Sequence, residues 1–241
     1  MTITDVGLAP APTLDPQTLQ IAGFAPFSSV DWPGLLSATL FLQGCPWECT
    51  YCHNPAMQDT RTAGSVSWDE VLATLRRRQG LLDAVVFSGG EPTRQRGLPA
   101  AMRVARELGF KVGLHTAGAF PGRLGELLPL ADWVGIDIKA APTAYERITS
   151  QAVSGVRAWT SLELVQRSGV DYEVRITIDP TVHTRDDVFD AVREVIRRGA
   201  KAPVLQQARP DGANPEYARR LAGRGMYDVI RHDDFPDLAR R

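Results

Sequence analysis

The sequence predicts an α/β fold whose parallel sheet curves into a partial barrel. Six short apolar segments alternate with helical segments along most of the 241 residues. Such alternation is typical of parallel sheets with right-handed crossover helices. Three of the expected strands also carry polar residues at alternate positions. An open sheet with helices on both faces would be apolar throughout, so the polar face is expected to line a wet or ligand-filled interior.

The expected strands are short apolar runs of strand length. In 133–138, the side chains of Val134, Ile136 and Ile138 share one face, because side chains alternate along a strand. Asp137 and Lys139 share the other face. A strand-like piece is expected at 21–24, followed by strands at 38–43, 84–87, 110–114, 133–138, 172–178 and 203–206, and 227–231 could add a terminal strand.

The helices are indicated by apolar residues at helical spacing and by start signals. Ser67 with Glu70, and Thr184 with Asp187, have the three-residue spacing of a capping box. The helices are expected to follow these caps and to cover roughly 98–108, 121–129, 154–168 and 214–223.

The composition indicates one domain. Residues 1–19 are rich in Ala, Pro and Thr and are expected to form a mobile tail, followed by a single domain over 20–241. The net charge of −1 gives no argument for a nucleic-acid partner. No run approaches the ~20 apolar residues of a membrane helix, and the start does not resemble a signal peptide. Three clustered cysteines fit a reducing cytoplasm without disulfides.

The three cysteines, Cys45, Cys49 and Cys52, are spaced C-x3-C-x2-C in one loop. Three thiolates can bind three irons of a four-iron cluster, which leaves the fourth iron open for chemistry. The alternative is zinc, which usually takes four ligands in two separated pairs. The nearby fourth candidate, His53, directly follows Cys52 and can hardly point to the same centre. The spacing therefore favours a cluster.

The spacing, with an aromatic residue before the third cysteine, resembles the signature of radical S-adenosylmethionine (SAM) enzymes. Residues 88–92 (Ser-Gly-Gly-Glu-Pro) resemble the GGEP motif of that family. The residues at 27–34, 41–45 and 51–55 resemble the corresponding sequences of the glycyl-radical-enzyme activases, most of all those of activating proteins of anaerobic ribonucleoside-triphosphate reductase. The resemblance spans roughly residues 21–212.

The resemblance implies a partial (β/α)6 barrel and a [4Fe–4S] cluster on Cys45, Cys49 and Cys52. It also implies that SAM binds the open iron, is reductively cleaved to a 5′-deoxyadenosyl radical, and that this radical generates a glycyl radical on a partner enzyme. The partner would be anaerobic (class III) ribonucleotide reductase. The sequence shows no second cysteine group, as the ferredoxin-like insert of some activases would have, and no electron-transfer domain, so flavodoxin or ferredoxin would supply the electron.

Other functions remain open. The chain could activate a pyruvate formate-lyase-like enzyme, or be a small radical SAM enzyme that acts on a nucleoside precursor. A non-enzymatic metal-binding module would keep its metal but cleave nothing, and the motifs disfavour it.

The resemblance also implies the residues that bind SAM. Gly89, Gly90 and Glu91 would bind the methionine amino group. Asp137 and Lys139 resemble the D-L-K stretch of the activases, and Lys139 would meet the methionine carboxylate.

Two further residues have an alternative role each. Arg175 would lie near the substrate, unless it belongs to an internal ion pair. Tyr51 resembles an aromatic near the adenine, unless it only packs in the core.

The sequence departs from the activases at His115-Thr-Ala-Gly118. Related activases have D-T-N-G here, and their aspartate helps to hold a monovalent cation. A neutral imidazole binds alkali cations poorly, so no such cation site is expected. His115 and Thr116 are instead predicted to contact the cofactor, with a buried core histidine as the alternative for His115.

Four other positions have smaller expected roles. His53 and Asn54 are expected to fix the cysteine loop, and Gln206 and Gln207 to lie at the mouth of the barrel. The remaining histidines, His183 and His232, are expected at the surface.

Overall fold

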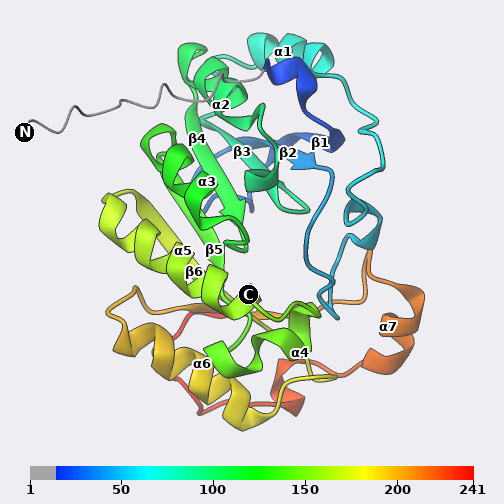
Figure 1. Cartoon of the computed structure of the whole chain (residues 1–241), viewed down its shortest axis with the longest axis vertical. Helices are drawn as coiled ribbons and strands as arrows, with labels where there is room; N and C mark the ends of the chain where they lie inside the picture. The colour runs from blue at the N-terminus through cyan, green and yellow to red at the C-terminus, as the bar shows by residue number, and fades with distance from the viewer. Residues whose placement is uncertain (1–14) are drawn as a thin grey trace, which may run out of the picture.

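The computed structural model describes residues 15–241 and is built around a curved sheet of seven strands (Figure 1). The strands follow one another across the sheet in chain order. β1 runs antiparallel to β2, whereas β2 to β7 are all parallel. The predicted alternation and the partial barrel are confirmed. The strands are β1 (Ile21–Ser28), β2 (Ser37–Leu42), β3 (Ala84–Gly89), β4 (Lys111–Thr116), β5 (Trp133–Asp137), β6 (Asp171–Ile178) and β7 (Val204–Gln207).

The helices cover the outer face of the sheet, where Figure 1 shows α2, α3, α5 and α6 beside the strands. Both predicted capping boxes are formed, at Ser67 for α1 and at Thr184 for α6. Each box satisfies amide groups that a helix leaves without partners at its first turn. The helices are α1 (Trp68–Arg77), α2 (Leu98–Glu107), α3 (Pro121–Leu127), α4 (Tyr145–Thr149), α5 (Ser154–Ser168), α6 (Arg185–Arg197) and α7 (Pro215–Leu221).

The two faces of the sheet are filled differently. Apolar side chains of the outer face, such as Val112 and Ile136, join the main core with the helices. The inner face carries a small apolar cluster in which Trp32 stacks on Trp133 with ring centroids 5.3 Å apart. Gly113 leaves room for this cluster, because a Cβ there would lie 2.9 Å from the Trp32 ring. The tryptophans fill the amino-terminal half of the interior, and polar residues of the same strands lie beyond them.

Several expected elements differ from the observed ones. The strand considered at 227–231 is wrong, because the chain forms a 3-10 helix there (Met226–Asp228), stabilised by the Asp228 carboxylate accepting from the amide of Gly225. The edge of β7 instead pairs with the end of the chain, where Leu205 donates to the Ala239 carbonyl. β1 extends to Ser28, four residues further than expected. The short α4 was not predicted, and it bears on the site below.

Most of the tail expected at 1–19 lies outside the described residues. Within them, Pro16–Thr18 forms a 3-10 helix, the side chain of Gln17 donates to Asp69 of α1, and Leu19 is buried. The packed part of the chain therefore includes residues just before 20. Among residues 15–241, no helix has the length and apolar character that a membrane crossing requires.

Candidate active site

The cysteine loop follows β2 and is held on two sides by backbone hydrogen bonds. On one side, the amides of Gly44 and Cys45 donate to the carbonyls of Met57 and Gln58 at 2.8 and 3.0 Å. On the other, the amides of Glu48 and Thr50 donate to carbonyls in the last turn of α4 at 3.1 and 3.2 Å. The final carbonyls of a helix have no partner within it. The short α4 therefore supplies acceptors that fix the middle of the loop.

The three cysteines are half-buried free thiols. Burial, with a smaller contribution from the Glu91 carboxylate, raises the pKa of the Cys45 thiol to about 12. Burial also raises the pKa of Cys49. Thiolates are the ligands of iron and zinc, so a bound cation must offset this cost. Within residues 15–241, no three Cys, His, Asp or Glu side chains are grouped closely enough to hold one metal ion. Three thiolates can each bind one iron of a four-iron cluster.

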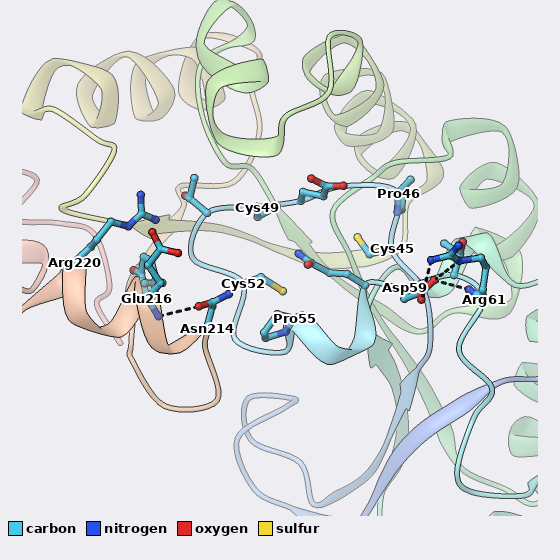
Figure 2. A pocket seen from close by; sticks show the side chains of 15 residues that line it. Cys45, Pro46, Cys49, Cys52, Pro55, Asp59, Arg61, Asn214, Glu216 and Arg220 are labelled. Carbon is cyan, nitrogen blue, oxygen red and sulfur yellow. Dashed lines mark hydrogen bonds and ion pairs between the residues drawn. The ribbon is translucent and has the colours of Figure 1, made fainter.

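The cysteine loop borders two cavities, and all three cysteines line both. The outer cavity, of about 710 Å³, lies between the loop, the segment around Arg61, and α7 with Glu216 and Arg220 (Figure 2). The inner cavity measures about 260 Å³ and lies at the carboxyl ends of the parallel strands. That position is where ligands bind in parallel α/β barrels. A group held by the thiols would therefore border the outer cavity on one side and the inner cavity, inside the barrel, on the other.

Gly89 and Gly90 line the inner cavity and also allow close packing of backbone. A Cβ on Gly89 would lie 2.2 Å from the Leu42 amide, and a Cβ on Gly90 would lie 2.6 Å from the Gly44 carbonyl oxygen. Gly89 additionally has φ +119°, which L-residues with side chains rarely adopt. The two glycines thus allow the end of β3 to pack directly against the start of the cysteine loop.

Glu91 is fully buried and joins the ends of β3 and β4. Its carboxylate accepts from the amide and hydroxyl of Thr93, from the Thr116 hydroxyl at 2.7 Å and from the Ala117 amide at 3.0 Å. Burial raises its pKa, although these hydrogen bonds act in the opposite direction. The protein's own donors engage both oxygens, and the role predicted for Glu91 toward a ligand ammonium stays a prediction.

Lys139 lies just beyond β5 and lines the inner cavity. Its amide donates to the Tyr145 hydroxyl at 2.9 Å, and its carbonyl lies 3.1 Å from Nε2 of His183. Its Nζ lies 5.4 Å from the centre of the Tyr51 ring and donates no hydrogen bond within the described residues. Burial alone would lower the pKa of Lys139, but its electrostatic interactions with Tyr51, Cys49 and Asp137 outweigh burial and raise the pKa. The cavity therefore contains an ammonium group without an acceptor.

His183 corrects the sequence prediction that placed it at the surface. Only 7% of the residue is exposed. Nδ1 accepts from the amide of Asp179, so Nε2 carries the proton and donates to the Lys139 carbonyl. The buried Asp179 carboxylate in turn accepts from the hydroxyl of Thr50 in the cysteine loop. No spacing signal in the sequence marks this histidine, because its two partners lie 4 and 44 residues away. His232 is exposed as expected.

Arg175 combines the two roles that the sequence left open. Its Nε donates to Glu173 at 3.0 Å, and the guanidinium lies 5.2 Å from the centre of the Trp133 ring. Gly135 makes room for it, since a Cβ there would lie 2.6 Å from the guanidinium. Arg175 therefore belongs to an internal ion pair and also lines the inner cavity.

Four more predicted residues line the same cavity: Tyr51, His115, Thr116 and Asp137. Tyr51 is buried, and its hydroxyl has no hydrogen-bond partner among the described residues. Register places His115 beside Gly135 and Asp137 beside Arg175. Nε2 of His115 lies 2.7 Å from the Asp31 carbonyl. The structure thus brings together side chains from the cysteine loop, β4 and β5, next to Arg175 of β6.

The rim of the cavity includes His53, Asn54 and Gln206. Nε2 of His53 accepts from the Arg209 amide at 3.2 Å, so the cysteine loop contacts the loop after β7. This contact agrees with the expected loop-fixing role of His53. Gln207 points elsewhere, since its amide oxygen accepts from the Met226 amide.

Comparisons with a family model and with individual known proteins point to the same family. Residues 39–195 match the model of the radical SAM superfamily. The chain is 30% identical over 208 residues to a protein of Methanocaldococcus jannaschii that is named as a glycyl-radical enzyme activating enzyme, covering 83% of this chain and 85% of the relative. It is 33% identical over 174 residues to the pyruvate formate-lyase-activating enzyme of Clostridium pasteurianum, covering 70% of this chain and 72% of the relative.

Solved structures show the same fold. A structure of anSMEcpe with bound AdoMet matches with a TM-score of 0.54 at 20% identity. The match covers 68% of this chain and 46% of that one, so this chain spans less than half of that structure's length.

Proposed function

Since the chain belongs to the radical SAM superfamily and, within it, to the glycyl-radical-enzyme activases, we propose that it generates a glycyl radical on an anaerobic ribonucleoside-triphosphate reductase. The observation that carries a SAM-dependent reaction is the ammonium of Lys139. It lies without an acceptor in a cavity that the three thiols also line. A methionine carboxylate on a cluster held by those thiols would supply the missing acceptor.

The family uses a [4Fe–4S] cluster and SAM, and the residues of the site fit both groups. Cys45, Cys49 and Cys52 would hold the cluster, and Gly89 and Gly90, which line the same cavity, would lie beside the amino-acid part of SAM. When bound, the two groups would supply the radical chemistry by which a hydrogen is removed from a glycine of the partner. The protein's residues position SAM and restrict water in the interior.

The choice of partner rests on two stretches of sequence. Two stretches, residues 30–34 (Val-Asp-Trp-Pro-Gly) and 52–55 (Cys-His-Asn-Pro), resemble the corresponding sequences of ribonucleotide reductase activases. In the fold, the first stretch lies under the inner cavity and the second forms part of its rim.

The comparisons support a second candidate equally well. Enzymes named as pyruvate formate-lyase-activating from Clostridium pasteurianum and Streptococcus mutans are 33% and 28% identical to this chain. A pyruvate formate-lyase-like enzyme is therefore the alternative partner. For either partner, we propose flavodoxin or ferredoxin as the electron donor and the cytoplasm as the location, because three clustered cysteines that remain free thiols suit a reducing compartment.

The test is made on protein reconstituted with iron and sulfide without oxygen. SAM and dithionite are added, and 5′-deoxyadenosine is measured. Its absence from fully loaded protein would contradict SAM cleavage. Each candidate partner is then added separately and the glycyl radical is recorded by EPR. A signal with the reductase but not with the lyase supports the proposed partner, and the reverse result replaces it with the alternative.

A further inference from the structure

His115 is the position at which the chain departs from its relatives, and its surroundings determine what the ring can bind. Nε2 lies 2.7 Å from the Asp31 carbonyl oxygen and 3.1 Å from a guanidinium nitrogen of Arg175. A carbonyl oxygen can only accept, and a guanidinium can only donate. One nitrogen cannot satisfy both neighbours in the same protonation state.

The shorter contact decides the location of the proton. If Nε2 were unprotonated, its lone pair would face the carbonyl lone pairs at 2.7 Å without a hydrogen between them. With the proton on Nε2, the ring donates to Asp31. Arg175 keeps its ion pair with Glu173 and its contact with Trp133. Burial and the Arg175 guanidinium lower the pKa of His115 to about 4, so the ring is neutral near pH 7 and Nδ1 is unprotonated.

The rest of the interior holds the ring in this orientation. The His115 ring meets Trp133 edge-on with centroids 5.6 Å apart, and Trp133 stacks on Trp32. Trp32 follows Asp31 directly, so one turn of the chain provides both the carbonyl acceptor and the aromatic support. Nδ1 makes no hydrogen bond within the described residues, and the ring lines the inner cavity.

We propose that Nδ1 of His115 is a hydrogen-bond acceptor for a hydroxyl group of the ligand, the 2′- or 3′-hydroxyl of an adenosine ribose. The inference rests on the proposed SAM-dependent function, since that function places an adenosine in the cavity. Asp137, which lines the same cavity, is a carboxylate and can also only accept. A vicinal diol, with two donors, is the part of the ligand that suits this environment. A cation is disfavoured, because the Arg175 guanidinium lies beside the ring.

The proton position is tested first, without any activity measurement. The oxidised, cluster-loaded protein is labelled with ¹⁵N-histidine, and the spectrum of His115→Gln identifies the His115 signals among the four histidines. The expected result at pH 6 is a protonated Nε2 and an unprotonated Nδ1. A proton on Nδ1 would overturn the proposal.

Ligand recognition is tested by calorimetry of the cluster-loaded protein with S-adenosylhomocysteine and its 2′-deoxy and 3′-deoxy analogues. The wild type should bind one deoxy analogue about 5- to 10-fold more weakly than the parent, the contribution of one hydrogen bond. In His115→Gln, an amide nitrogen can still donate to Asp31 but the Nδ1 acceptor is lost, so this preference should disappear. In His115→Asn, whose amide oxygen occupies the Nδ1 position, the preference should remain.

Three other outcomes can be told apart. If S-adenosylhomocysteine does not bind the loaded protein at all, the proposed SAM-dependent function fails. If it binds but His115→Gln retains the full preference, only the role of His115 fails. If K⁺ or Na⁺ tightens binding in the wild type and not in His115→Gln, the ring holds a cation instead of a hydroxyl, which also overturns the proposal.

Discussion

Two cationic side chains, Lys139 and Arg175, line the inner cavity, and they differ in how their charge is compensated. Arg175 is neutralised by Glu173, which also binds Arg241 at 2.8 and 2.9 Å. Within residues 15–241, Nζ of Lys139 donates no hydrogen bond and forms no ion pair, and it lies 5.4 Å from the centre of the Tyr51 ring. A buried charge without a partner costs several kcal/mol, on the order of a whole domain's margin of stability. Such a charge is best explained by a ligand that supplies the partner.

Lys139→Gln should therefore weaken SAM binding and leave the cluster in place. A hydrogen bond to a charged group contributes about 1.5–3 kcal/mol, which corresponds to roughly 10- to 100-fold in affinity. Calorimetry with SAM on the cluster-loaded variant measures the loss, and iron analysis measures the cluster. Lys111→Gln is the matched control, since Lys111 is exposed at the start of β4. A variant that loses iron instead of affinity would show that Lys139 is structural.

Among the elements, β3 and α4 make the contacts that hold the cysteine loop in place. The amides at its start donate to the segment that follows it, and the amides at its middle donate to α4. The end of β3 then contacts it through two glycines without side chains. The loop is thus fixed by close backbone contacts, which tolerate little extra volume.

Gly90→Ala should displace the loop. A Cβ at this position would lie 2.6 Å from the Gly44 carbonyl oxygen and 2.8 Å from that of Met57, distances that require one strand end to move. Such overpacking costs about 1–3 kcal/mol. Denaturant unfolding should show this loss, and iron content after reconstitution should fall.

Gly125→Ala is the control for this change. Gly125 lies within α3, and nothing lies within 4 Å of a Cβ added there. Alanine is a better helix former than glycine, so this variant should gain about 0.5–1 kcal/mol. If Gly90→Ala and Gly125→Ala had the same stability and the same iron content, close packing of the loop on Gly90 would be refuted.

At the scale of the whole molecule, the turn after β6 connects segments that are distant in sequence. Asp179 accepts from Thr50 of the cysteine loop, and His183 donates to Lys139 after β5. Tyr145 of the segment after β5 binds the Lys139 amide from the other side. The cysteine loop and the lysine of the cavity are therefore fixed by one buried set of hydrogen bonds.

His183→Ala should lower the free energy of unfolding by about 2–4 kcal/mol, since the change leaves the Lys139 carbonyl and the Asp179 amide without partners and opens a cavity. Urea unfolding measures the change. His232→Ala, at an exposed histidine, should stay within about 0.5 kcal/mol of the wild type. Equal losses in the two variants would mean that His183 does not hold this part of the structure.

The sequence by itself determined the parallel sheet, the helix starts at Ser67 and Thr184, and the cysteine loop with its radical SAM resemblance. These features are encoded locally: hydrophobic periods, capping residues and motif spacing all act within a few residues. The polar faces of β5 and β6 also followed from the alternation of side chains. They correctly placed Asp137, Lys139 and Arg175 in the interior.

Only the tertiary structure decided the burial of His183, the hydrogen bonds that protein donors make to Glu91, and the proton position on His115. In each case the deciding partners come from other strands or loops, such as Asp31 for His115 and Lys139 for His183. A residue's type gives its capacity to donate or accept, but its partners depend on how distant segments pack. For this reason the sequence identified the residues around the cofactor, while the fold determined which of their atoms remain available to a ligand.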